Sequence, residues 1–275
     1  SPGEASMTLG RCSLWAAAVC WVFSSLMAGC AMPPAATGDG KDRVTESDET
    51  DASKRARTRM ELATAYFSRG QLTTALDEVK LALIANPNMG EAYNLRGLIY
   101  AGLGDDVLAQ ESFNRALQIN PRDGDTMHNY GWYLCQKKNY AEAEAMFQRA
   151  LTLPQYLGTN RTLLTSGICQ ARAGKWAEAE VTLTKAYERD ASNPATAINL
   201  AEVLLQRGEL ERARFYVRRV NAVANQSTAQ TLWLAARIEM KLGNRQAANE
   251  YGLQLRNRFP QSRESSAFDR GLFNE

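Results

Sequence analysis

Histidine, the side chain most often used for acid–base catalysis and metal binding, occurs only once in this chain, as His128. A catalytic triad or a histidine-based metal site would need partner residues at a suitable spacing, and none accompanies His128. No phosphate-binding loop or paired-carboxylate motif is present either. The 32 basic and 30 acidic residues nearly balance, so the charge does not indicate a nucleic-acid partner. We expect no enzyme activity, cofactor, metal or small-molecule substrate.

Cys30 is the cysteine with the clearest chemistry. An apolar run from Leu14 to Leu26 follows Arg11 and ends in Leu26-Met27-Ala28-Gly29-Cys30. The run is shorter than the roughly 20 residues that span a bilayer, and the pattern is typical of a signal peptide. Its end resembles the lipobox of bacterial lipoproteins, which implies that the Cys30 thiol is diacylglycerylated first, the chain is then cut before Cys30, and the new amine is acylated. The alternative is an ordinary secretory signal with an incidental cysteine.

The residues after Cys30 suggest a tether and a location. Ala31 stands where aspartate would favour the inner membrane, so resemblance to enterobacterial sorting implies the outer membrane, with acyl chains as a lasting anchor. Residues 31–53 are rich in proline, glycine and charge, and we expect them to be disordered. We therefore expect a signal peptide at 1–29, an acylated flexible tether at 30–54, a folded array at 55–262 and a C-terminal tail at 263–275. The protein would lie on the periplasmic face of the outer membrane of a Gram-negative bacterium.

From about residue 56 the chain repeats itself with a period near 34, in six copies. The clearest copy contains Tyr93, Gly97, Tyr100, Gly104, Ala109, Phe113, Ala116 and Pro121. The small residue at Gly97 and the alanine at 109 suit two helices that cross closely, and the proline ends the second helix. One such copy cannot bury its own apolar face, whereas a stack can.

This spacing resembles the tetratricopeptide repeat. The resemblance implies an all-α fold, a right-handed superhelix of about six helix-turn-helix repeats whose first helices line a groove. The groove-facing positions, by the same resemblance, include Met60, Phe67, Asn94, Leu98, His128, Asn129, Trp132, Gln136, Ile168, Arg172, Ile198, Asn199, Glu202 and Trp233. As the candidate partner-binding groove we take Asn94, Leu98, His128, Asn129, Trp132, Gln136, Arg172, Asn199 and Glu202.

Four of these residues carry specific expectations. Asn129 and Asn199 stand where peptide-binding repeats often carry asparagine, whose amide can hydrogen-bond to an extended backbone. Trp132 could be an apolar anchor in the groove, or it could pack between neighbouring first helices. His128 should be a solvated or hydrogen-bonded residue of the groove.

Cys135 and Cys169 lie 34 residues apart, in the first helices of neighbouring copies. The periplasm is oxidising, which favours a disulfide between them. Two buried thiols are the alternative, because offset positions on adjacent helices can hold the Cα atoms more than about 7 Å apart.

Two stretches resemble one particular family of repeat lipoproteins. They are residues 128–138, His-Asn-Tyr-Gly-Trp-Tyr-Leu-Cys-Gln-Lys-Lys, and residues 248–260, Ala-Asn-Glu-Tyr-Gly-Leu-Gln-Leu-Arg-Asn-Arg-Phe-Pro. Both are similar to the type IV pilus biogenesis and stability lipoproteins, the pilotins of the pilus secretin. The resemblance implies a scaffold that localises the secretin or stabilises its multimer through protein–protein contacts. The alternative is another periplasmic repeat lipoprotein, an adaptor for outer-membrane protein assembly or for peptidoglycan hydrolases.

Overall fold

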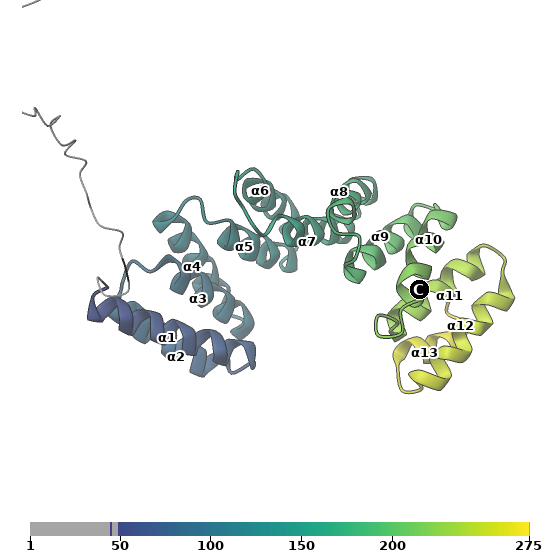
Figure 1. The fold of residues 1–275 in the computed structure, drawn as a ribbon, viewed down its shortest axis with the longest axis horizontal. Coiled ribbons are helices and arrows are strands. Elements are labelled where there is room, and N and C mark those ends of the chain that lie inside the picture. The colour runs from purple at the N-terminus through teal and green to yellow at the C-terminus, as the bar shows by residue number, and fades with distance from the viewer. Residues whose placement is uncertain (1–44, 46–48, 275) are drawn as a thin grey trace, which may run out of the picture. The chain divides into compact units, whose positions relative to one another are not determined.

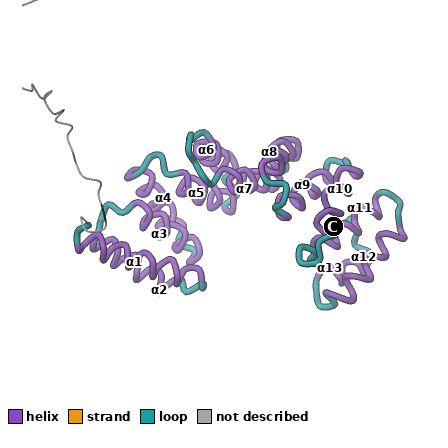
Figure 2. Tube along the Cα trace, viewed as in Figure 1, coloured by secondary structure: helices purple, strands orange, loops and turns teal. Residues whose placement is uncertain are grey.

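The computed structural model describes residue 45 and residues 49–274, which form thirteen α-helices and no strand (Figure 1; Figure 2). Every described helix belongs to the unit Asp48–Glu275. The expected signal peptide, Cys30 and nearly all of the expected tether lie outside the described residues. Within the described ranges, no helix is long and apolar enough to cross a membrane.

The first twelve helices form six consecutive pairs, one pair for each sequence repeat. The pairs are α1 (Asp51–Ser68) with α2 (Leu72–Ala85), α3 (Gly90–Leu103) with α4 (Asp106–Ile119), α5 (Gly124–Gln136) with α6 (Tyr140–Leu151), α7 (Thr159–Arg172) with α8 (Trp176–Arg189), α9 (Pro194–Gln206) with α10 (Leu210–Asn221), and α11 (Ala229–Lys241) with α12 (Arg245–Arg258). The prediction of an all-helical array of six repeats is confirmed.

The helices pack in two layers. Each first helix contacts the first helix of the next repeat, and each second helix contacts its own first helix and the one that follows. The backbones of successive second helices lie farther apart, although α8 and α10 meet through side chains, with the ring centroids of Tyr187 and Tyr216 at 4.9 Å. Each repeat therefore buries its apolar side chains only against its immediate neighbours in sequence.

Close helix crossing inside each repeat explains the small residues of the sequence pattern. A Cβ atom added at Gly97 would lie 2.6 Å from the Phe113 ring, too close for any real side chain. The same relation holds in the next two repeats, for Gly131 with Phe147 at 2.7 Å and for Gly167 with Leu183 at 2.5 Å. The alanines that open the second helices have no exposed surface: Ala75, Ala109, Ala143, Ala179, Ala213 and Ala248.

Helix ends follow the local sequence. Helices α2 and α4 end directly before Asn86-Pro87 and Asn120-Pro121, because proline offers no N–H and disfavours helix in the residue before it. Helices α4 and α5 are each preceded by an N-cap aspartate, Asp105 and Asp123. The carboxylates of these aspartates accept hydrogen bonds from the backbone N–H groups of Leu108 and Asp125.

The C-terminal segment 263–275, expected as a tail, contains a thirteenth helix, α13 (Arg263–Asp269), that contacts α11 and α12. Its Phe268 packs over Gly252, where a Cβ would clash with the ring. Phe273 follows and lies with its ring centroid 5.2 Å from that of Trp233. The last repeat has no successor to cover its apolar face, so this short segment covers it instead.

The turn between the two helices of a repeat takes a left-handed backbone conformation, which favours glycine. Five repeats have glycine there: Gly70, Gly104, Gly174, Gly208 and Gly243. The third repeat has Lys138, with φ of 62°, the only described non-glycine residue with positive φ. The backbone of the third repeat is therefore strained at this position.

We expect Lys138→Gly to raise the free energy of unfolding by about 0.5–1 kcal/mol, because glycine adopts this conformation without a Cβ clash. The matched control is Gly104→Lys, which should lower it by a similar amount, since a Cβ at Gly104 would meet no heavy atom within 4 Å and only backbone strain changes. Urea denaturation of both variants measures the effect. A loss of stability in Lys138→Gly would contradict the strain argument.

Candidate partner-binding surface

The predicted groove residues lie on the first helices, and two pairs of them hydrogen-bond across successive repeats, Asn94 with Asn129 and Gln136 with Arg172. Asn129 on α5 donates an amide hydrogen bond to Asn94 Oδ1 on α3, over 3.1 Å. Asn199 on α9 instead donates to the Ala195 carbonyl of its own helix, at 2.8 Å. Both asparagines thus have one donor engaged before any partner binds, and a bound backbone would use their remaining atoms.

Trp132 is half-buried and contacts the next repeat, in agreement with the expected packing between neighbouring first helices. One side packs against the core around α5 and α6, and the Arg172 guanidinium of the next repeat lies 4.7 Å from its ring centroid. Arg172 also donates to Gln136 Oε1 at 3.2 Å. These three residues form a cation–π and hydrogen-bond cluster that joins α5 to α7 on the groove face.

A third contact joins the groove residue Glu202 on α9 to α11. Arg237 donates from Nη1 to Glu202 Oε2 at 3.0 Å and from Nη2 to Glu202 Oε1 at 3.3 Å. Arg237 is not among the predicted groove residues, although it stands one repeat after Glu202 and has the opposite charge. Leu98 is half-buried and packs against the core beside Trp132. The groove face is therefore polar and largely self-paired.

His128 does not face solvent. It is 7% exposed, and its Nδ1 lies 2.9 Å from Thr162 Oγ1 on α7, which also contacts the Tyr156 hydroxyl at 2.8 Å. Burial, with a smaller contribution from the Arg161 charge, lowers the pKa of His128 from 6.5 to about 4. His128 is thus a neutral, hydrogen-bonded residue between two repeats.

Three further positions that the repeat resemblance placed in the groove are buried as well. Met60, Ile198 and Trp233 are each less than one-tenth exposed. These three residues and His128 offer little surface to a partner, because adjacent first helices pack closely enough to cover them. Of the two alternatives expected for His128, the structure agrees with the hydrogen-bonded one.

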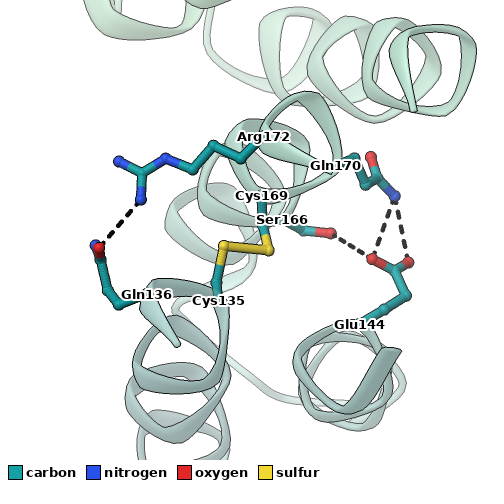
Figure 3. Close-up of a disulfide and its surroundings, with 7 residues drawn as sticks. All are labelled: Cys135, Gln136, Glu144, Ser166, Cys169, Gln170 and Arg172. Atoms are coloured by element: carbon teal, nitrogen blue, oxygen red, sulfur yellow. Dashed lines mark hydrogen bonds between the residues drawn. A yellow bond between two sulfur atoms is a disulfide. The ribbon is translucent and has the colours of Figure 1, made fainter. Parts of the chain in front are cut away.

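Cys135 on α5 and Cys169 on α7 form a disulfide, with their Cα atoms 6.0 Å apart (Figure 3). Both residues are buried. Figure 3 shows the bond between two polar contacts, Arg172 with Gln136 on one side and the Glu144 carboxylate on the other. The disulfide joins the third and fourth repeats covalently through their first helices.

Glu239 on α11 forms ion pairs that the sequence pattern does not indicate. Its carboxylate is 1% exposed and lies 3.1 Å from Arg214 Nε and 3.3 Å from Arg218 Nη2, both on α10. A buried carboxylate needs such partners, and two arginines satisfy that need across a repeat boundary. The part of the chain that the structure describes contains no group of three His, Cys, Asp or Glu residues able to hold a metal.

Comparison with known proteins agrees with the paired helices. Profiles of the tetratricopeptide repeat match residues 88–155 and 170–236. Together with six helix pairs and a face of cross-repeat contacts, this defines the chain as a tetratricopeptide repeat protein, a class that typically works through protein contacts.

Two pilus proteins resemble the chain over most of its length. The crystal structure of PilW, a widely conserved type IV pilus biogenesis factor, is 33% identical with a TM-score of 0.72, covering 77% of this chain and 97% of that one. The type IV pilus assembly protein PilF of Pseudomonas aeruginosa is 27% identical over 212 residues, 76% of this chain and 82% of PilF. A PilF structure has a TM-score of 0.70 at 24% identity, covering 81% of this chain and all of that one. The chain belongs to the family of tetratricopeptide repeat proteins of type IV pilus biogenesis.

We expect the double variant Cys135→Ala/Cys169→Ala to lower the free energy of unfolding by about 3–4 kcal/mol, because the disulfide closes a loop of this length in the unfolded chain. Urea denaturation in the absence of reductant measures the loss. Hydrogen exchange should locate it at α5 and α7. Reductant should destabilise the parent chain and leave the double variant unchanged; an equal effect on both would contradict the prediction.

Because the folded-state pKa of His128 is lowered to about 4, its contribution to stability is present above pH 6.5 and is lost as the pH falls toward 4. We expect the parent chain to lose about 2 kcal/mol more than His128→Gln between about pH 7.5 and about pH 5. Urea denaturation of both proteins at the two pH values measures this difference. The two proteins have the same carboxylates, so the pH dependence of stability that these groups cause cancels in the comparison. Parallel pH profiles would contradict the prediction.

Proposed function

We propose that this chain is an outer-membrane lipoprotein that acts as the pilotin of the type IV pilus secretin. It brings the secretin to the outer membrane or stabilises its multimer. The observation that carries the proposal is the similarity to PilW, described as a type IV pilus biogenesis factor, over nearly the whole of that protein. A repeat array acts in such a pathway by holding another protein in place.

The anchor in this proposal is Cys30. The sequence Leu26-Met27-Ala28-Gly29-Cys30 supports cleavage before the cysteine and acylation of its thiol and amine. Each buried methylene contributes about 0.8 kcal/mol, and several acyl chains together hold a protein on a membrane almost permanently. Ala31 supports transfer to the outer membrane, where the repeats would lie on the periplasmic side.

In this proposal the repeats hold the partner. The contacts between neighbouring repeats make the array a stiff support for it. The disulfide and the pairs Asn94 with Asn129 and Glu202 with Arg237 each join neighbouring repeats. Such links reduce the bending of the array, so less conformational entropy is lost when a partner binds. Electrostatic and hydrogen-bonding groups, rather than reacting groups, dominate the face, and the proposed function is that of a scaffold.

The test is an unboiled gel of outer membranes, probed for heat-labile secretin multimers in cells with the wild-type chain, no chain, or Cys30→Ser. We expect multimers to leave the outer membrane without the chain and not to be restored by Cys30→Ser, because the variant lacks its anchor. Cys12→Ser, made at equal expression, is the matched control for loss of a cysteine elsewhere, because Cys12 lies in the expected signal peptide. It should retain multimers in the outer membrane, since its anchor is intact.

Unchanged secretin multimers in all strains would overturn the pilotin proposal. Wild-type behaviour of Cys30→Ser alone would overturn the lipid anchor and leave the secretin role. The two parts of the proposal are therefore tested separately.

A further inference from the structure

The loops that connect successive repeats form two adjacent hollows along one edge of the array. The first hollow has a volume of about 590 Å³ and lies between the connections α4–α5 and α6–α7. The second has a volume of about 570 Å³ and lies between the connections α2–α3 and α4–α5. We call the two hollows together the loop-edge surface. The groove-face residues Trp132, Arg172 and Glu202 line neither hollow, whereas Asn94, which accepts a hydrogen bond from Asn129, lines the second.

The first hollow has a wall that is fixed by the protein core. Tyr156 packs directly on Gly124, where an added Cβ would lie 2.5 Å from the ring. The Tyr156 hydroxyl bonds to Thr162, which bonds in turn to buried His128. Leu153, from the same loop, packs against the core cluster around α5 and α6. The hollow therefore exists before any partner binds, which lowers the entropy that binding must overcome.

An exposed leucine stands on the rim of this hollow. Leu157 is fully exposed, at 101%, more than any other large apolar residue that the structure describes. It belongs to the connection 152–158 between α6 and α7, which is longer than the corresponding connections 86–89 and 120–123. A single exposed leucine is ordinary, but one beside a preformed hollow lined by Leu153 and Tyr156 provides apolar area for a partner side chain.

The second hollow has a different chemistry. Its carboxylates are Glu91, Asp123 and Asp125, and no lysine or arginine lines it. Arg161 pairs with Asp125 at 2.8 Å, whereas Glu91 and Asp123 have no cationic partner among the described residues. This lining favours a basic side chain over an acidic one.

Asparagine amides line the same hollow and suit an extended backbone. Asn86 Oδ1 accepts from the backbone N–H of Asn88, and Asn120 Oδ1 accepts from that of Arg122, both at 3.1 Å. These bonds fix the two side chains and leave their NH₂ groups as donors. Carbonyl groups of a bound extended chain would be suitable acceptors.

The spacing of the two hollows sets the spacing of the side chains that would occupy them. Asp125 lines both hollows, and their other walls come from loops one repeat apart. First helices of successive repeats lie about 8–10 Å apart. An extended chain in the polyproline II conformation rises about 3.1 Å per residue with three residues per turn, so side chains three positions apart lie on the same face, about 9 Å from each other. Two side chains that enter the two hollows should therefore be about three residues apart.

We propose that the loop-edge surface binds an extended segment of a protein partner that carries an apolar residue and, about three positions away, a lysine or arginine. The apolar residue occupies the first hollow beside Leu157, and the basic residue lies against Glu91 and Asp123. This inference does not depend on the pilotin proposal, since it names a peptide chemistry and not a particular partner. An anionic membrane fits less well, because its phosphates would meet the carboxylates of the second hollow.

The test uses the full chain carrying Cys30→Ser and blocked, fluorescent peptides of about ten residues. The peptides have a serine and glycine background with one leucine and one lysine, and their separation is varied in both orders. Fluorescence polarisation measures binding. We expect the tightest binding at a separation of about three, and weakening by about fivefold or more when glutamate replaces lysine.

Two variants and two matched controls connect binding to the surface. Leu157→Ser should weaken binding about fivefold, and Glu91→Lys should remove the preference for lysine over glutamate peptides. Leu253→Ser and Glu178→Lys change exposed residues of the same kinds elsewhere and should bind as the parent does. Because all four side chains are exposed, thermal melts should match the parent.

The proposal is overturned if lysine and glutamate peptides bind the parent equally. It is also overturned if every peptide binds the Leu157→Ser/Glu91→Lys double variant as tightly as it binds the parent. It is also overturned if the parent sediments with phosphatidylglycerol vesicles through Leu157 and binds no peptide, which would assign the surface to lipid.

Discussion

The structure depends on close packing between the two helices of each repeat. Where Gly97 meets Phe113 and Gly131 meets Phe147, the helices approach so closely that not even a methyl group fits between backbone and ring. The rings are fully buried because of this approach. Each pair then has a fixed shape and leaves one apolar side uncovered, and only another pair of the same shape can cover it. The repeat period and the succession of layers both follow from this contact.

The same packing explains why the groove face is largely self-paired. Adjacent first helices are close enough for side chains one repeat apart to meet, so Asn94 bonds to Asn129 and Glu202 to Arg237. A partner in the groove would have to replace these bonds with equally good ones, and the net gain from each exchange is small. On the loop edge, Glu91 and the NH₂ groups of Asn86 and Asn120 have no hydrogen-bond or ion-pair partner among the described residues. A partner can use these groups without replacing an existing bond, which favours recognition at the edge.

The sequence predicts what depends on contacts within a repeat. Glycine, alanine and proline at fixed spacing report the helix crossing and the helix ends, and those features agree with the structure. It predicts less well what depends on the offset between repeats. His128 is buried because Thr162 and Phe147 surround it, and no periodic pattern indicates on which side of a first helix the next repeat packs. The sequence predicts a tail where helix α13 lies, because no repeat matches there. The apolar residues Phe268 and Phe273 indicate instead a segment that packs on the last repeat.

Two connections break the regular spacing, and the contrast between them bears on function. After α10, residues 222–228 are held by polar contacts: Arg258 donates to the Ser227 carbonyl at 3.1 Å, and Asn221 donates to the Thr231 carbonyl at 3.0 Å. After α6, residues 152–158 have the same length and leave Leu157 fully exposed beside a hollow of about 590 Å³. The apolar residue of the other connection, Val223, is only 43% exposed, beside a smaller hollow of about 210 Å³. A longer connection alone therefore does not require an exposed leucine. Folding gains nothing from an apolar side chain in water, so the position of Leu157 is better explained by a surface that a partner covers.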